Sequence, residues 1–174
     1  MNLLGAGDLI LKEHRMIENN FTREAYDESL QRSLKEICQY SAKYNINVHL
    51  RTVSGKNSNN LEQVSALVQS VNEPNFYLAP VTALILNDPE KFEKNIAILK
   101  NLKFRIFLVG APEEDIFGTQ WNNTKPIINF PDRPALKKLL LSFPERTLVL
   151  EGIYDGPDEE YMDIRTLENL QNNN

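Results

Sequence analysis

The fold is decided by the stretch Thr147-Leu148-Val149-Leu150-Glu151-Gly152-Ile153-Tyr154-Asp155-Gly156. Its opening residues are apolar or β-branched, and the run ends at the carboxylate of Glu151, where Gly152 and the pair Asp155-Gly156 break it. This pattern predicts a short buried strand that leads into a turn. A charged side chain at the end of a buried strand is typical of a ligand site at the carboxyl end of a parallel sheet.

Earlier segments have the same strand pattern, and helix patterns lie between them. The strand candidates are residues 47–53, 76–80 and 103–109. Apolar residues recur at the three- and four-residue steps of amphipathic helices in residues 22–44, 61–71, 88–99, 133–142 and 158–170. Because strands and helices alternate, right-handed crossovers make the strands parallel neighbours. We therefore predict an α/β fold built from parallel βα units.

The two ends of the chain give less regular patterns. Residues 2–4 are interpreted as the end of a strand and residues 5–8 as a turn. Residues 9–20 have no clean period, so a loop with a short helix is expected there. Asp158 is expected to cap the last helix. The inward face of that helix is expected to consist of Tyr161, Ile164, Leu167 and Leu170.

The composition fits one globular domain. No linker divides the 174 residues, so residues 1–174 are expected to form a single βα-repeat domain with one core. The net charge of -5 argues against a nucleic-acid partner, which needs clustered Lys and Arg. The sequence has no leader pattern and no apolar stretch long enough to span a bilayer, and its single cysteine, Cys38, excludes an internal disulfide. We expect no membrane partner and a cytoplasmic location.

Several segments then resemble a known family. Residues 4–8, the helix pattern of residues 29–46 and the strand Val48-His49-Leu50 are similar to the middle of a xylose isomerase-like TIM barrel. This superfamily contains sugar isomerases, epimerases and nucleases of the endonuclease IV type. The strand end Leu150-Glu151 is similar to the eighth strand of the family, which closes on a glutamate. The resemblance implies a partial or half TIM barrel, the C-terminal half from the end of the fourth strand to the eighth helix.

The resemblance also implies that strands are missing. Four or five strands cannot close a barrel, so the sheet either stays open or is completed from elsewhere. The source would be another domain, the remainder of a larger chain or a second copy in a homo-oligomer. An uncovered parallel edge would itself be an association site.

Family members bind one to three divalent metals through acidic and histidine side chains at strand ends, and such ions need several converging ligands. Arg51 stands where the resemblance implies a glutamate, at the end of the fifth strand. The sixth and seventh positions, Leu78-Ala79-Pro80 and Leu108-Val109-Gly110, offer no ligand. Only Glu151 remains. No metal cofactor is therefore expected, unless the missing half supplies the ligands.

Arg51 and Glu151 would end strands that open into the same space. One interpretation is a salt bridge between them. The other is a pocket for an anionic or hydroxylated ligand, in which Arg51 donates and Glu151 is an acceptor or the catalytic general base. His49 is expected to point away from Arg51, toward a covering helix.

Four further residues are candidates for substrate binding. The long connection after residue 109 carries Asp115 and Trp121. They either bind a small carbohydrate, by stacking on the indole and accepting from hydroxyls, or anchor the loop. Tyr154 and Asp155 follow the last strand and would line the same rim.

Three functions from different classes remain open. The first is a sugar-related domain with degenerate metal ligands that binds a carbohydrate or serves as a structural module. The second is an active sugar isomerase or epimerase, in which Glu151 acts as the base and the missing half supplies the other groups. The third is a protein-interaction domain of flavodoxin-like shape.

Overall fold

The structure, a computed structural model, describes residues 7–12, 23–52, 61–86, 89–112, 124–130, 132–152 and 154–172. Its strands are β1 (Asp8–Lys12), β2 (Asn47–Arg51), β3 (Phe76–Ala79), β4 (Ile106–Val109), β5 (Ala111–Pro112), β6 (Thr124–Lys125) and β7 (Thr147–Leu150). Its helices are α1 (Arg23–Ala42), α2 (Leu61–Val71), α3 (Thr82–Leu86), α4 (Phe92–Lys100), α5 (Arg133–Leu141) and α6 (Pro157–Asn172), with short 3-10 helices η2 (Pro89–Lys91) and η3 (Ile127–Asn129). Within these residues, no helix combines the length and the apolar character that a membrane crossing requires.

Two parallel sheets, β1-β2-β3 and β4-β7, are joined by isolated bridges, so that five parallel strands lie in the curved order β1-β2-β3-β4-β7, and β5 and β6 form a separate antiparallel pair. β2 pairs with β1 and with β3, and β4 pairs with β7, in parallel register throughout. Parallel bridges between Leu78 and Phe104 and between Val81 and Leu108 join the two groups. A 3.0 Å backbone hydrogen bond from Leu78 N to Lys103 O adds to this junction. The predicted α/β fold of parallel βα units is confirmed.

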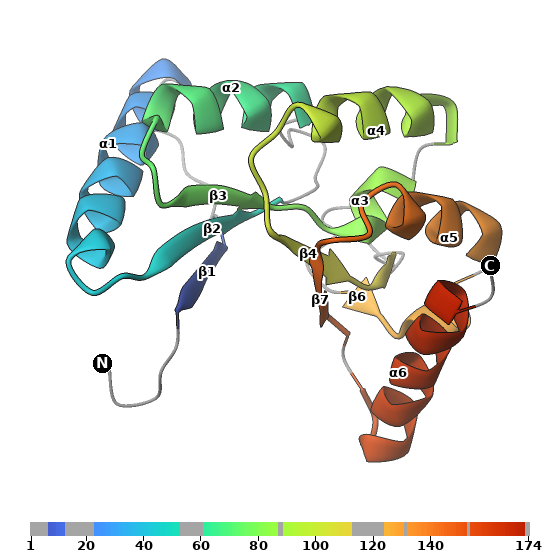
Figure 1. Ribbon diagram of the computed structural model, residues 1–174. Coiled ribbons are helices and arrows are strands. Elements are labelled where there is room, and N and C mark those ends of the chain that lie inside the picture. Colours follow the sequence, from blue (N-terminus) through green and yellow to red (C-terminus); the bar gives the residue numbers. More distant parts are fainter. Residues whose placement is uncertain are drawn as a thin grey trace.

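The strand order shows that the flavodoxin-like shape of the third alternative is wrong, whereas its protein-interaction role stays a prediction. A flavodoxin-like sheet has the order 2-1-3-4-5, because the second strand lies on the far side of the first. Here the five strands lie side by side in the order in which they follow along the chain. Figure 1 shows α1, α2, α4 and α5 as an arc around the strands. This is the arrangement of consecutive units of a TIM barrel.

The main core lies between the sheet and this arc of helices. Val48 and Leu50 of β2 and Leu78 of β3 point to this outer side and are fully buried. Each helix adds an apolar stripe, formed by Leu34 and Cys38 of α1, Val64 and Val68 of α2, Phe92, Ile96 and Leu99 of α4, and Leu136, Leu139 and Leu140 of α5. The alternate residues of the strands form a separate, smaller apolar group on the inner side, with Ala79, Ile106 and Leu108. We call this side the inner face.

Asparagines end the first two helices. Asn45 (φ 56°) and Asn72 (φ 48°) have left-handed backbone conformations, which Asn tolerates better than most residues. After α1, Ile46 N donates to Ser41 O and Asn45 N donates to Ala42 O, both at 3.1 Å. These two bonds satisfy carbonyls of the last helical turn and direct the chain into β2.

The first strand does not lie where the sequence pattern places it. Asp8–Lys12 form β1, although a turn was expected at residues 5–8 and a loop with a short helix at residues 9–20. Leu9-Ile10-Leu11 is a short apolar run without a helical period, and pairing with β2 settles its conformation. The helix expected at residues 88–99 begins only at Phe92, after η2, and α3 was not expected.

The last helix presents a different face from the one predicted. Asp158 lies inside α6, which begins at Pro157, so it is not the cap. Tyr161 and Ile164, expected to face inward, are 52% and 41% exposed. Asp163 is fully buried instead, because it accepts hydrogen bonds from η3. The expected burial of Leu167 is confirmed.

Candidate functional site

The carboxyl ends of the strands meet at one edge of the sheet, which we call the mouth. It consists of Arg51 at the end of β2 and four residues that follow strands, Thr52, Thr82, Gly110 and Glu151. In parallel βα barrels this edge carries the ligand sites.

Arg51 and Glu151 form a bidentate ion pair across the mouth. Arg51 Nε and Nη2 donate to the two carboxylate oxygens of Glu151, the second at 2.9 Å, and Nη1 donates to the Thr52 carbonyl at 3.2 Å. The Arg51 side chain is 6% exposed and that of Glu151 is 28% exposed. The salt bridge, one of the two interpretations of these residues, is therefore present. Two parallel bonds between a guanidinium and a carboxylate also fix the orientation of both groups.

The ion pair depends on the curvature of the sheet. β2 and β7 are separated by β3 and β4. Three steps of about 4.8 Å would place them roughly 14 Å apart in a flat sheet, where side chains rise side by side and would not meet. Arg51 and Glu151 do meet, because the strands curl and both side chains point from the inner face toward the same axis.

Two buried threonines connect the other strand ends. Thr52 Oγ1 accepts a 2.9 Å hydrogen bond from Val81 N, which ties β2 to the end of β3. Thr82 Oγ1 accepts from Gly110 N at 3.1 Å and donates to Gly110 O at 2.9 Å, which ties β3 to β4. Sequence reasoning missed both residues. The signal was a β-branched hydroxyl residue just after an apolar strand, where a backbone donor has lost its ladder partner.

Tyr154, a predicted substrate-binding residue, is turned toward α6. Its hydroxyl donates to Asp163 Oδ2 at 3.1 Å, and its ring lies over Gly152, where an added Cβ would come within 2.9 Å of Cζ. Burial, together with the nearby charge of Asp163, raises the pKa of Tyr154 well above its ordinary value. Tyr154 is therefore a neutral hydrogen-bond donor that positions the segment after Glu151.

Of the other predicted residues, Asp155 alone lies among the described ones, and its hydrogen bond is to α6 rather than to the mouth. Asp155 is exposed in the turn before α6, and its backbone N donates to Glu159 Oε2 at 3.0 Å. Asp115 and Trp121 lie outside the described residues. Their role in carbohydrate binding stays a prediction.

Asp163 is a buried carboxylate that sequence reasoning missed. It is 0% exposed and accepts hydrogen bonds from Ile127 N at 2.7 Å and Ile128 N at 2.8 Å, in addition to Tyr154. These bonds cap the first turn of η3 and attach it to α6. Asp163 follows an acidic helix start, Asp158-Glu159-Glu160, so nothing in the sequence distinguishes it from solvated charges.

A second polar group lies at the amino end of the inner face. His49 is 0% exposed, its Nε2 lies 2.8 Å from Asp8 Oδ1, and its ring stacks on Tyr77 with centroids 5.2 Å apart. The expectation that His49 points away from Arg51 is wrong. Residues two apart on a strand share a face, so both point to the inner side and His49 contacts neighbouring strands rather than a helix.

The pKa of Asp8 is shifted by its burial and by its contacts with His49 and Asn47. Burial alone raises it, but hydrogen bonds from His49 and Asn47 and the charges of His49 and Arg105 outweigh that effect. The net result is a pKa below the ordinary value. Asp8 therefore attaches the edge strand β1 to β2 as an ionised carboxylate.

A divalent metal, which the family resemblance implies, does not fit the described residues. Within them no group of three or more His, Cys, Asp and Glu side chains is arranged to hold an ion. At the mouth, Glu151 faces the guanidinium of Arg51, a fixed positive charge where a cation would have to bind. What these residues offer a ligand is a set of directed donors and acceptors.

The curved parallel sheet, the outer helices and the polar groups at the carboxyl ends define part of a TIM barrel. Among TIM barrels, it has the fold of the xylose isomerase-like proteins, because solved structures of that kind superpose on nearly the whole chain. The sequence matches no protein-family model and none of the curated proteins.

Three solved structures illustrate the likeness. A xylose isomerase domain protein from Planctomyces limnophilus gives a TM-score of 0.66 at 14% identity, over 97% of this chain and 59% of that one. The 3-keto-D-glucoside 4-epimerase from E. coli, in its apo form, gives 0.66 at 12% identity, over 93% and 62%. A xylose isomerase-like TIM barrel protein from Mycobacterium smegmatis, in complex with magnesium, gives 0.62 at 11% identity, over 96% and 63%. The chain spans about three fifths of these proteins, and identities this low establish the fold alone.

Proposed function

We propose that this chain binds a small carbohydrate at the mouth, using the Arg51–Glu151 pair in place of a protein-bound metal. The observation that carries the proposal is the bidentate pair itself, which presents directed donors and acceptors on the inner face at the carboxyl ends of the strands. Support comes from proteins with the same fold that are named for sugars, such as D-psicose 3-epimerase in the presence of D-fructose, over 86% of this chain and 50% of that one with a TM-score of 0.57.

A polyhydroxylated ligand suits both partners of the pair. A guanidinium is a donor only and an ionised carboxylate is an acceptor only, whereas a sugar hydroxyl is both. A vicinal diol can therefore donate to Glu151 and accept from Arg51 while the two charges stay close together. Glu151, 28% exposed, is the more accessible partner, and Arg51, 6% exposed, orients it.

Calorimetric titration with a panel of monosaccharides and sugar phosphates tests the proposal. We expect saturable binding of at least one compound, weakened at least tenfold by Arg51→Met, which corresponds to about 1.4 kcal/mol. The matched control is Lys138→Met, because Lys138 is also paired, with Glu93, but is 58% exposed and lies on the outer helix α5. A flat response across the panel, or binding that Arg51→Met leaves intact in a folded variant, would count against the proposal.

The second candidate is a sugar isomerase or epimerase with Glu151 as general base. It is favoured by the accessible carboxylate at the mouth and by the epimerase names of several proteins with this fold. In this case Glu151 takes the proton next to a sugar carbonyl, and Arg51 holds its orientation. Solvent deuterium would then enter the sugars that bind, and Glu151→Gln would abolish this exchange. Binding without any exchange would leave the chain as a carbohydrate-binding module.

A further inference from the structure

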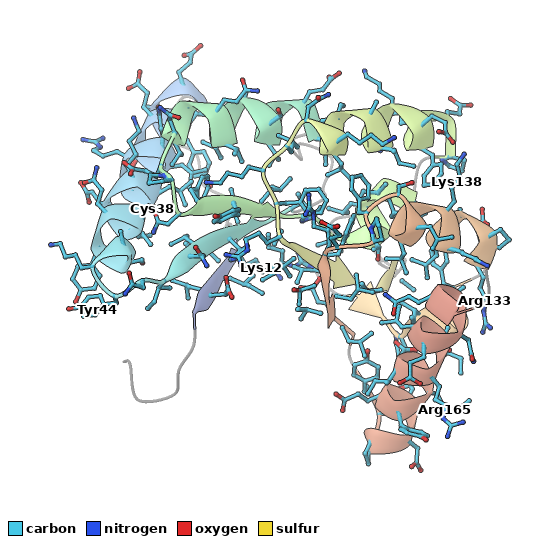
Figure 2. All side chains as sticks on the ribbon, in the orientation of Figure 1. Lys12, Cys38, Tyr44, Arg133, Lys138 and Arg165 are labelled. Atoms are coloured by element: carbon cyan, nitrogen blue, oxygen red, sulfur yellow. The ribbon has the colours of Figure 1, made fainter. Side chains whose placement is uncertain are left out.

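The last residue of β1, Lys12, lies next to the mouth. In the parallel register of β1 and β2, Lys12 is paired with Arg51. Neighbouring strands are about 4.8 Å apart, so the two cationic side chains start from adjacent positions at the same end of the sheet. Figure 2 shows Lys12 at the end of β1, beside β2 and toward the middle of the molecule. Lys12 was not among the candidate residues found from the sequence.

Lys12 belongs to the inner face. Residues two or four apart on a strand share a face, so Lys12 points to the same side as Asp8. Asp8 lies 2.8 Å from Nε2 of His49, which is an inner-face residue. Leu11, the alternate residue of β1, packs instead against the outer core. Lys12 therefore lies on the same side of the sheet as the ion pair at the mouth.

The Arg51 side chain is directed away from Lys12. Its partner in the register of β3 is Ala79, whose methyl group is too small to block the inner face at that position. The Arg51 guanidinium reaches past it to the carboxylate of Glu151, which follows β7. The ion pair is therefore displaced toward β7, whereas Lys12 lies on the β1 side of Arg51.

Charge is unevenly distributed over this end of the sheet. Of the described residues that end or directly follow the five parallel strands, the charged ones are Lys12, Arg51 and Glu151. Two are cations and one is an anion, although the whole chain has a net charge of -5. Because Arg51 and Glu151 neutralise each other in their bidentate pair, these residues carry one positive charge in excess. A ligand with a single negative charge complements it.

We propose that Lys12 binds the carboxylate of a sugar acid whose hydroxyls contact the Arg51–Glu151 pair. Lys12 has this role only if the proposed carbohydrate site exists, and the role narrows that site to one substrate class. An ammonium group has three donors, so Lys12 can hold a carboxylate oxygen together with a second acceptor. Lys12 is exposed, and its flexible stem lets the ammonium meet a ligand from the solvent side.

A sugar phosphate fits these residues less well. A phosphate monoester carries a charge of about -1.5 to -2 at pH 7, more than one excess cation balances. Phosphate sites commonly use backbone N–H groups that point at the ligand. Here the backbone N–H groups of Val81, Gly110 and Glu151 already donate to acceptors of the protein. A carboxylate has one charge and needs only the side-chain donor.

Calorimetric titration with matched ligands tests the proposal. Each set contains a neutral hexose, its uronate, its aldonate and its 6-phosphate, such as D-glucose, D-glucuronate, D-gluconate and D-glucose 6-phosphate. We expect at least one sugar acid to bind at least tenfold more tightly than its neutral parent and its phosphate. Lys12→Met should remove this preference, and Lys12→Arg should keep most of it. The control Lys100→Met removes an exposed cation from the last turn of α4, before the opposite end of β4, and should leave the preference unchanged.

The results separate the role of Lys12 from the carbohydrate site itself. Equal affinities within each set, or a preference that Lys12→Met leaves intact in a folded variant, would overturn the role of Lys12 while the carbohydrate site stands. Tightest binding of the 6-phosphates would overturn the substrate class. If no ligand binds, both proposals fall.

Ionic strength provides an independent check. The preference for the sugar acid should decrease as salt is added, because an exposed pair of charges is screened. A preference that salt leaves unchanged would contradict a contact between the ammonium and the carboxylate. Circular dichroism confirms that each variant is folded.

Discussion

The carboxylates of Glu151 and Asp163 each accept two or more hydrogen bonds, but from different kinds of donor group. Asp163 is 0% exposed and accepts from the backbone N–H groups of Ile127 and Ile128 and from the Tyr154 hydroxyl. Glu151 is 28% exposed and accepts from the guanidinium of Arg51. Backbone donors are fixed by the fold and cannot turn to another acceptor, whereas a side-chain donor can.

This difference separates a structural carboxylate from a candidate for ligand binding. A ligand that approached Asp163 would have to open η3 and α6, because the carboxylate is enclosed by the elements it connects. A ligand at the mouth meets Glu151 from the solvent side and finds a donor group that can be shared. The contrast can be tested by removing each carboxylate or its partners, in order of the expected effect on stability.

Asp163→Ala should give the largest effect. It leaves two buried N–H groups and the Tyr154 hydroxyl without their acceptor, and each unsatisfied buried donor costs about 1–3 kcal/mol. We expect the free energy of unfolding, measured by urea denaturation, to fall by about 3–4 kcal/mol. The control Glu168→Ala, an exposed position on the same helix, should change it by less than about 0.5 kcal/mol. An equally small effect for Asp163→Ala would show that α6 and η3 are not held by this carboxylate.

Arg51→Met should have the next largest effect. It leaves a partly buried Glu151 without its guanidinium, and the expected loss is about 2–3 kcal/mol. The double variant Arg51→Met with Glu151→Met should recover most of this loss, because a buried ion pair and an apolar pair of similar volume are nearly equal in stability. If the double variant is no more stable than Arg51→Met, the pair is not the source of the effect.

Tyr154→Phe isolates one donor of the Asp163 network. Removal of one hydroxyl that donates to a buried carboxylate should lower the free energy of unfolding by about 1 kcal/mol. In the Asp163→Ala background the same substitution should have almost no effect, because its partner is already gone. Equal effects in the two backgrounds would show that Tyr154 stabilises the chain through its packing on Gly152 instead.

The sequence was sufficient for most of the strands and helices and for one of these two carboxylates. Strand patterns with period two and helix patterns with period 3.6 place β2, β3, β7, α1 and α2 well, because their apolar faces are continuous. Glu151 was found because it ends an apolar strand. β1 was misplaced, since its apolar run becomes a strand only by pairing with β2, about 40 residues later along the chain.

Asp163 and the threonines of the mouth could not be found in the same way. Asp163 is buried because η3 lies against α6, and a contact between residues 36 apart leaves no trace in local periodicity. The Thr82 hydroxyl joins β3 to β4 only because the backbone of Gly110 lies beside it. Ile164 is the opposite case, because it was expected to face inward but is 41% exposed, while Asp163 and Leu167 of the same helix are buried. Local pattern thus predicts what a helix can bury, and tertiary contacts decide what it does bury.

Asp8 is a third carboxylate, and its hydrogen-bond partners are the side chains of Asn47 and His49. The Asp8 side chain is 44% exposed. Its pKa in the folded chain lies below the ordinary value of 3.8, so the ionised form stabilises the fold. That contribution is complete above the unfolded pKa and is lost as the pH falls through the folded one. Solvent screening at this exposure limits the expected effect to about 0.5 kcal/mol.

Urea denaturation at pH values from about 3 to about 7 measures the free energy of unfolding of the natural chain and of Asp8→Asn. The difference between the two should be constant above about pH 4 and shrink below it. Asn keeps one acceptor and loses the charge, so the difference reports the ionised form that His49 and Asn47 stabilise. A difference that grows as the pH falls would mean that Asp8 is more easily protonated in the folded chain. The carboxylate at the edge of the sheet would then be held as a neutral hydrogen-bonding group, unlike Glu151 at the mouth.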